Sequence, residues 1–138
     1  ANLINQTFRK DEKKLVTFVT GGDPDLSTSL EIIKTIINNG VDIIEIGMPF
    51  SDPMADGPTI QQSSIRAIKN KIDLEDIFKI SRNFRKTNDE TPLILMGYYN
   101  VIFHFGIKST YKCYRHNCCS CIFCQMKRAF FKWAKFTR

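Results

Sequence analysis

The sequence predicts an α/β protein with a parallel sheet, because short apolar strands alternate with amphipathic helices along most of the chain. Each predicted strand is apolar almost throughout, as expected where helices and other elements cover both faces of a parallel sheet. Turns rich in Gly, Pro and Asp follow the first two strands. Periodicity alone does not distinguish an open, doubly wound sheet from a closed barrel, but both carry their chemistry at the carboxyl ends of the strands.

The predicted elements follow one another without long gaps. In chain order they are a short charged helix at 7–14, a strand at 15–20, a helix at 26–39, a strand at 41–48, helices at 59–69 and 73–86, and a strand at 93–96. Ser27 or Thr28 is expected to cap the 26–39 helix, and Asn39-Gly40 to end it. Residues 100–106 are expected to form a loop and one helical turn. The carboxyl-end rule directs attention to residues 20–22, 45–58 and 96–100.

Length and composition indicate an ordinary globular protein. The chain has 138 residues, of which 43% are hydrophobic and 25% charged. No apolar run approaches the roughly 20 residues of a membrane span, and the charged residues 1–14 do not resemble a signal peptide. A cytoplasmic protein is therefore expected.

Glu45 stands out because it interrupts the apolar run of the second predicted strand. A carboxylate inside a parallel strand is costly unless it is paired or solvated at a strand end. Desolvation of such a group favours proton transfer at neutral pH. The alternative is a strand-end glutamate held in a structural ion pair.

The segment 49–61 directly follows this strand and contains three prolines and two aspartates, Asp52 and Asp56. Its stiffness would hold a carboxylate at a fixed distance from Glu45. Two separated carboxylates can divide acid and base roles when their surroundings differ. The alternative is that both aspartates only cap turns.

Two long segments, 15–24 and 42–61, closely resemble the alpha subunit of tryptophan synthase, and residues 95–100 with Phe103 and Gly106-Ile107 extend the match. The resemblance covers residues 1–107. It implies a partial TIM (β/α)₈ barrel of about three βα units, since a complete barrel has eight strands and roughly 250 residues. Residues 1–107 are thus expected to form a partial barrel domain, followed by a tail at 108–138.

The resemblance also implies a function. The family is a lyase of tryptophan biosynthesis that cleaves indole-3-glycerol phosphate to indole and glyceraldehyde 3-phosphate by a retro-aldol step. Glu45 matches the general acid/base that moves protons between the C3 hydroxyl of the substrate and C3 of the indole. Asp56 matches the residue that hydrogen-bonds the indole N–H and stabilises positive charge.

Further residues match positions around this chemistry. Phe18 and Tyr98 match residues that line the indole pocket, and Asp52 and Asn100 match residues that face the beta subunit. By the resemblance, the alpha subunit needs no metal or cofactor of its own. Its partner in the heterotetramer, the beta subunit, carries pyridoxal phosphate and receives the indole.

The tail, 108–138, differs from the rest of the chain. It holds eight of the twenty basic residues, all five cysteines and the tryptophan, and no acidic residue, so that residues 1–107 carry a net charge of −2. It lacks the helix, the strand and the phosphate-binding loops with which the family continues. We interpret it as irregular and non-homologous, as expected if the coding sequence is read in a shifted frame, and we expect the chain alone to be inactive and aggregation-prone.

Other interpretations of the chain remain open. The crowded cysteines, with His116 among them, would suit zinc, although zinc sites usually pair two separated ligand couples. Basic residues interleaved with aromatic ones would suit nucleic acid, and a basic tail would also suit disorder. The partial barrel would also suit a non-catalytic module that docks on a beta subunit or on another half-barrel.

Overall fold

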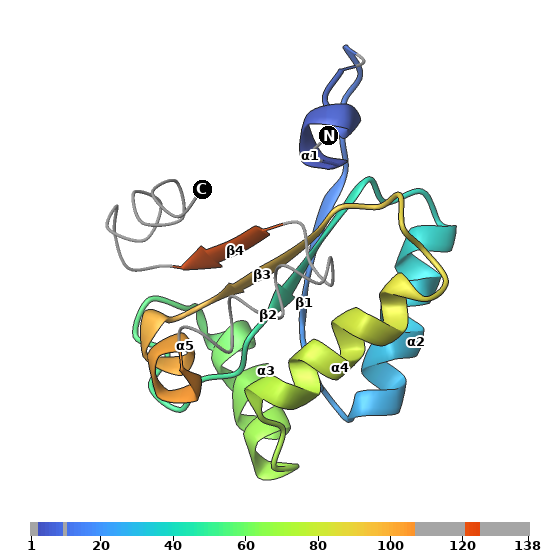
Figure 1. The fold of residues 1–138 in the computed structure, drawn as a ribbon. Coiled ribbons are helices and arrows are strands. Elements are labelled where there is room, and N and C mark those ends of the chain that lie inside the picture. Colours follow the sequence, from blue (N-terminus) through green and yellow to red (C-terminus); the bar gives the residue numbers. More distant parts are fainter. Residues whose placement is uncertain (1–2, 10, 107–120, 125–138) are drawn as a thin grey trace.

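The computed structural model describes residues 3–9, 11–106 and 121–124. Its elements are α1 (Leu3–Thr7), β1 (Val16–Thr20), α2 (Leu26–Asn38), β2 (Ile43–Gly47), α3 (Pro58–Lys69), α4 (Leu74–Arg85), β3 (Leu93–Gly97), α5 (Tyr99–Phe105) and β4 (Cys121–Cys124). The four strands form one parallel sheet in the order β1-β2-β3-β4 (Figure 1). The predicted parallel α/β architecture is therefore confirmed.

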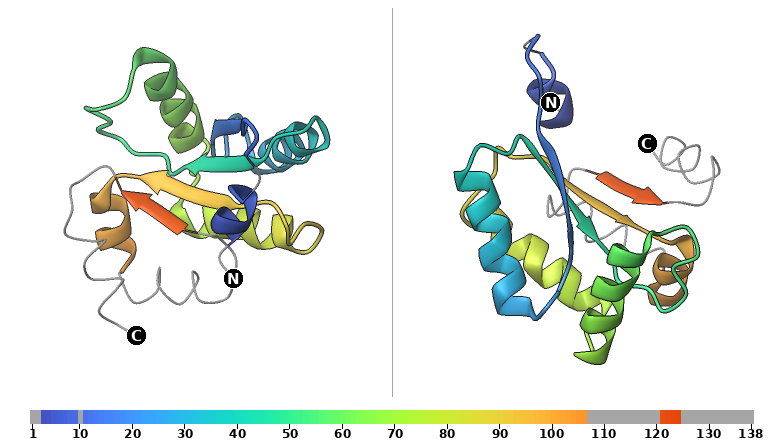
Figure 2. Two further views of the ribbon diagram at one scale, coloured as in Figure 1. Left: turned by 90° about the horizontal axis from the view of Figure 1, so that it is seen from above. Right: turned by 180° about the vertical axis from the view of Figure 1, so that it is seen from behind.

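The core lies between one face of this sheet and the helices α2, α4 and α5. Strand residues on this face alternate in sequence, as Ile44 and Ile46 do on β2 and Leu93 and Leu95 on β3, and all four are buried. Helix α4 contributes most of the opposing side chains, among them Ile77 and the large rings of Phe78 and Phe84. Helices α2 and α4 lie side by side over the sheet (Figures 1 and 2).

The two ends of the sheet differ. Helix α1 lies at the amino ends of the strands, and α3 and α5 lie at the carboxyl ends (Figure 1). Within residues 11–106, the longest loop is 48–57, between β2 and α3, and it is also at the carboxyl end. Because strands of a parallel sheet all end at the same edge, the residues that follow β1, β2 and β3 meet there.

Four details differ from the prediction. The first helix is α1, Leu3–Thr7, and not the charged segment 7–14. Residues 13–15 have no regular secondary structure, and the Lys14 ammonium lies 3.2 Å from the Glu12 carboxylate and 3.6 Å from that of Asp42. Residues 99–105 form the helix α5, which is longer than the single turn expected.

The third difference is β4, Cys121–Cys124, which extends the sheet beside β3. The sequence predicts three strands and an irregular tail, and the prediction of an irregular tail is wrong for residues 121–124. The composition of the tail could not predict this strand, because the backbone of any extended segment can complete the hydrogen bonds of an open strand edge. The remaining residues of the tail lie outside the described ones, as do the expectations made for them.

Helix α2 begins at Asp25, and not at Ser27 or Thr28. The Asp25 carboxylate accepts hydrogen bonds from the Thr28 backbone N–H (2.9 Å), the Thr28 hydroxyl (2.8 Å) and the Ser27 hydroxyl (2.6 Å). The two predicted caps are therefore donors to the real one. The helix ends as predicted at Asn39, followed by Gly40 with φ +89°.

No helix among the described residues is long and apolar enough to cross a membrane.

The Asp25 cap makes a pH-dependent contribution to stability. Hydrogen bonds, first from the Ser27 hydroxyl and then from Thr28, lower the pKa of the Asp25 carboxyl to about 2. A carboxyl whose pKa is lower in the folded chain stabilises it above its unfolded value, near 3.8, and loses this effect as the pH falls to about 2. We therefore expect the stability of the native chain, followed by urea unfolding, to fall more steeply between pH 4 and 2 than that of Asp25→Asn. Parallel pH profiles would contradict this assignment of the cap.

Candidate active site at the carboxyl ends of the strands

A small hollow lies at the carboxyl ends of β1, β2 and β3, and we call it the strand-end hollow. Its volume is about 20 Å³, room for about one water molecule. Its walls come from three strands, the 48–57 loop and the first turns of α3: Phe18, Thr20, Gly47, Met48, Asp56, Ile60, Ser64, Met96, Gly97 and Tyr98. The sheet therefore brings together three residues that the sequence analysis selects for the site, Phe18, Asp56 and Tyr98.

The floor of the hollow is a row of residues paired across the sheet. Thr20 on β1 pairs with Gly47 on β2, which pairs with Met96 on β3. A glycine is required in the middle of this row, because a Cβ at Gly47 would overlap the ring of Phe18 and lie 2.9 Å from its Cε2 atom. The ring thus occupies the space that a side chain would fill.

The loop 48–57, which we call the aspartate loop, holds Asp56 at the rim of the hollow. The Asp56 backbone N–H donates to the carbonyl of Pro53 (3.0 Å), which closes a turn within the loop. The Gln61 side chain on α3 donates to the carbonyl of Asp56 (2.8 Å). These contacts tie the loop to the helix that follows it, so the position of Asp56 is fixed relative to α3.

Tyr98 ties the same loop to the end of β3. The Ala55 backbone N–H donates to the Tyr98 hydroxyl (2.8 Å), and the ring of Phe50 lies 4.9 Å from the Tyr98 ring. Desolvation, followed by the charge of Asp56 and a hydrogen bond to its carboxylate, raises the pKa of the Tyr98 phenol. The phenol therefore remains protonated at neutral pH and serves as a hydrogen-bond donor as well as an acceptor.

Glu45 lies on the same face of the sheet as the hollow, two residues before Gly47 on β2. It pairs with Phe18 on β1 and Ile94 on β3, and these three residues face away from the helix-covered core that receives Ile44 and Ile46. Its side chain is half-buried, although both neighbours along the strand are buried. It is not among the residues that line the hollow, so the structure places Glu45 on the face that carries the hollow without bringing it against Asp56.

Asp52 and Asn100 lie outside the hollow, and both are exposed. Each lies near an exposed apolar side chain in sequence: Met54 (84% exposed) follows Asp52 in the loop, and Phe103 (65% exposed) follows Asn100 in α5. The loop and the beginning of α5 are linked through Tyr98. The two residues predicted to face a partner thus lie on solvent-exposed surface beside the site.

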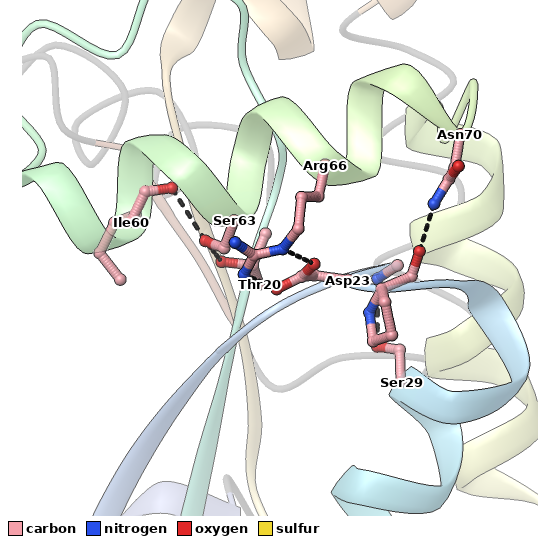
Figure 3. Close-up of polar contacts among 9 residues, drawn as sticks. Thr20, Asp23, Ser29, Ile60, Ser63, Arg66 and Asn70 are labelled. Carbon is pink, nitrogen blue, oxygen red and sulfur yellow. Dashed lines mark hydrogen bonds and ion pairs between the residues drawn. The ribbon is translucent and has the colours of Figure 1, made fainter.

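Helix α3 is fastened to the turn after β1 by a set of polar contacts (Figure 3). The hydroxyls of Thr20 and Ser63 are 2.6 Å apart, and Ser63 donates to the carbonyl of Ile60 (2.8 Å). Since Ser63 uses its hydrogen on Ile60, Thr20 is the donor in the first bond. Both hydroxyls are buried, and losing the Ser63 hydroxyl would leave that of Thr20 without the acceptor of this bond, at a cost of about 1–3 kcal/mol.

Two further contacts extend this set along α3. The guanidinium of Arg66 donates to both carboxylate oxygens of Asp23 (2.8 and 2.7 Å), and the Asn70 amide donates to the carbonyl of Pro24 (Figure 3). Arg66 is half-exposed, so this ion pair contributes less than the buried hydroxyl pair. Together with the Thr20–Ser63 pair, these two contacts hold α3 against the end of β1 and the turn that follows it. The first turns of α3 carry Ile60 and Ser64, which line the strand-end hollow.

Several residues of the hollow were not predicted individually. Thr20, Gly47, Met48, Met96 and Gly97 fall in the segments that the carboxyl-end rule selects, but nothing in the sequence shows which of them face the hollow. Ile60 and Ser64 were missed altogether. Their four-residue spacing at the start of the helix after the aspartate loop is the only signal that would have indicated them.

A larger hollow, of about 310 Å³, lies at the opposite, amino ends of the strands, where Lys14, Asp42 and Glu90 are among its lining residues. Size alone would favour it as a site. Parallel α/β sheets, however, carry their functional loops at the carboxyl ends, where the aspartate loop lies.

Among the described residues, no group of three or more His, Cys, Asp or Glu side chains could hold a metal ion. The proposed zinc and nucleic-acid functions of the tail concern side chains outside that part of the chain.

The strands lie in the sheet in their chain order, with helices packed over one face and the hollow at the carboxyl ends. This is the arrangement of the first strands of a (β/α) barrel protein. A model of the tryptophan synthase alpha chain family matches residues 4–123. The chain belongs to this family. The match continues past Ile107, where the sequence analysis ends the resemblance, and reaches into β4.

Individual relatives agree with this assignment. The tryptophan synthase alpha chain of Nitrosomonas europaea is 49% identical over 107 residues, 78% of this chain and 39% of the relative. That of Zymomonas mobilis is 50% identical over 109 residues, 79% of this chain and 40% of the relative. The chain thus spans about two fifths of the length of these relatives.

Solved structures show the same fold. The tryptophan synthase alpha subunit of Legionella pneumophila matches with a TM-score of 0.83 and 36% identity over 86% of this chain and 47% of that one. A protein from Aquifex aeolicus matches with a TM-score of 0.85 and 38% identity over 96% of this chain and 52% of that one. The fold prediction, a partial TIM barrel, is confirmed, with four strands described and not three.

The packing of Phe18 on Gly47 predicts a sharp steric requirement. Gly47→Ala should lower the free energy of unfolding by about 1–3 kcal/mol, because the new methyl group and the Phe18 ring cannot occupy the same space. Adding Phe18→Leu should restore part of the loss. Gly57→Ala is the matched control, since a Cβ there has no atom within 4 Å. Urea unfolding measures all three, and a Gly47→Ala chain as stable as the native one would refute the close contact.

Proposed function

We propose that this chain is the amino-terminal part of an alpha subunit of tryptophan synthase, which cleaves indole-3-glycerol phosphate to indole and glyceraldehyde 3-phosphate. The observation that carries the proposal is the strand-end hollow, where Phe18, Asp56 and Tyr98 meet in a chain of this family. Aromatic side chains suit an indole ring, and a carboxylate at the rim suits its N–H group. The hollow, which holds about one water molecule here, has to widen to admit the ring.

The proposed reaction uses two carboxylates in different roles. Glu45 passes a proton from the C3 hydroxyl of the substrate to C3 of the indole, and the carbon–carbon bond then breaks to release the aldehyde. Asp56 accepts a hydrogen bond from the indole N–H and stabilises the positive charge that develops when C3 is protonated. The position of Glu45 on the face that carries the hollow supports this division, because an extended substrate would reach from the rim down to it.

The phosphate end of the substrate needs residues beyond this site. No lysine or arginine is among the described residues that line the strand-end hollow. Phosphate is bound in such barrels by backbone N–H groups of later loops and a helix amino terminus. We therefore propose that the described part of the chain holds the indole end only, and that this chain by itself turns over substrate very slowly or not at all.

The proposal extends to cofactor, partner and location. The retro-aldol step needs no metal or cofactor in this subunit. The indole passes to a beta subunit that carries pyridoxal phosphate, within an alpha–beta heterotetramer in the cytoplasm. Membership of the family supports these points.

A chimera tests the catalytic proposal directly. Residues 1–106 of this chain would be joined to the remainder of the Nitrosomonas europaea alpha chain, and indole release from indole-3-glycerol phosphate would be measured. We expect activity in the chimera, a loss of about 100-fold or more for Glu45→Gln and for Asp56→Asn, and a small effect for Asp52→Asn. The unmodified chain is expected to release almost no indole.

Two results would overturn this proposal. An active chimera that keeps its rate after Glu45→Gln would remove the proposed acid/base. Turnover by the unmodified chain at the rate of a full-length subunit would show that no further phosphate site is needed.

A second function, docking on a beta subunit without catalysis, is favoured by the exposed surface around Asp52. The neighbouring Met54 and the Phe103 ring on α5 are largely exposed, as expected for side chains that become covered in an assembly. This function would remain available to a chain that lacks the phosphate site.

Copurification with a tagged beta subunit tests the docking function. Asp52→Ala should weaken binding by about tenfold, equivalent to about 1.4 kcal/mol, because a charged contact in the interface is lost. Asp89→Ala is the control, since Asp89 is exposed in the turn before β3, at the opposite end of the sheet. Equal retention of all three chains would argue against docking through this loop.

A further inference from the structure

We infer that Tyr98 is a positioning residue, whose hydroxyl fixes the Asp56 carboxylate at the rim of the strand-end hollow by bonding to two successive residues of the aspartate loop. The inference rests on the proposed role of Asp56 and goes beyond it. It assigns to Tyr98 a function separate from lining the pocket for indole.

The backbone at the end of β3 aims Tyr98 into the site. The strand ends at Gly97, and Tyr98 keeps extended dihedral angles (φ −84°, ψ 143°) before α5 begins at Tyr99. Alternation along an extended chain therefore places Tyr98 on the same face as Met96, which also lines the hollow. The ring consequently reaches the loop that lies across the carboxyl end of β2.

The Tyr98 hydroxyl makes two different bonds with this loop. Its oxygen accepts from the Ala55 backbone N–H at 2.8 Å. The Asp56 carboxylate, which also borders the hollow, raises the pKa of the phenol by its charge and by a hydrogen bond from the hydroxyl. Accepting from one residue and donating to the next restrains both the backbone and the side chain at this point. The contact of the Phe50 ring with Tyr98, at 4.9 Å, secures the beginning of the loop.

Tyr98 anchors the loop to a distant part of the chain, whereas the contacts made by Pro53 and Gln61 are local. The Asp56 N–H bonds within the loop to Pro53, and Gln61 bonds to the loop from the helix that immediately follows it. Both contacts preserve the shape of the loop relative to α3. Tyr98 is 43 residues from Ala55 in the sequence, and its hydrogen bond fixes the position of the loop relative to the strands that carry Phe18 and Glu45.

Hydrogen exchange tests the acceptor bond. Tyr98→Phe keeps the ring contact with Phe50 and removes only the hydroxyl, so we expect exchange of the Ala55 amide in the full chain to accelerate by about tenfold or more, as for a lost hydrogen bond of about 1.4 kcal/mol. Tyr99→Phe, the adjacent tyrosine, is the matched control and should leave the Ala55 amide unchanged. Unchanged exchange in Tyr98→Phe would overturn the inference.

Titration of the phenol tests the donor bond, and does so without altering Tyr98. NMR of carbon-13 at Cζ of tyrosine reports the pKa of Tyr98, which Asp56 raises by its charge and its hydrogen bond. Asp56→Asn should lower this pKa, whereas Asp52→Asn, an exposed aspartate of the same loop, should not. If the phenol and the Asp56 carboxylate were not in contact, the two variants would behave alike, and equal effects would refute the inference.

Neither measurement requires substrate or turnover. Failure of the chimera to release indole would therefore contradict the proposed reaction and leave the anchoring of the loop intact. Conversely, an active chimera whose Ala55 amide and Tyr98 phenol do not respond would retain the reaction and lose the anchor.

Discussion

Parallel pairing of β1, β2 and β3 is the constraint from which the rest of this structure follows. Consecutive parallel strands need a crossover connection that carries the chain back along the sheet, and here these connections place α2 and α4 over one face. The apolar side chains of that face form the core. The same pairing ends all the strands at one edge, so the segments that leave β1, β2 and β3 converge there, and the opposite face of the sheet remains available for the site.

Within that frame, small residues and short polar contacts determine the shape of the site. Gly47 leaves room for the Phe18 ring, and the buried Thr20–Ser63 hydroxyl pair holds α3 close to the end of β1. The aspartate loop is then fixed at both sides, by Gln61 from α3 and by Tyr98 from the end of β3. The position of Asp56 is therefore set by elements that are far apart in the sequence.

Much of the fold was predictable because it depends on local patterns. The strands and the long helices appear close to their expected residues, and Asn39-Gly40 ends α2 as its turn chemistry predicts. The cap of α2 was misassigned because Asp25, Ser27 and Thr28 are all good capping residues, and only the geometry shows which one accepts the bonds. Strand β4 was missed because the edge of β3, and not the composition of the tail, provides its hydrogen-bonding partner.

The sequence by itself determined the class of fold, the family and the residue types of the site, because hydrophobic periodicity and the unusual segment from Glu45 to Gln61 are properties of the chain alone. Tertiary structure decided which of those residues meet. Phe18, Asp56 and Tyr98 surround one hollow, whereas Glu45 lies on the same face two residues before Gly47, and Asp52 and Asn100 lie outside on exposed surface. The physical reason is register: which side chains of neighbouring strands share a row depends on the pairing of segments that are distant in the sequence.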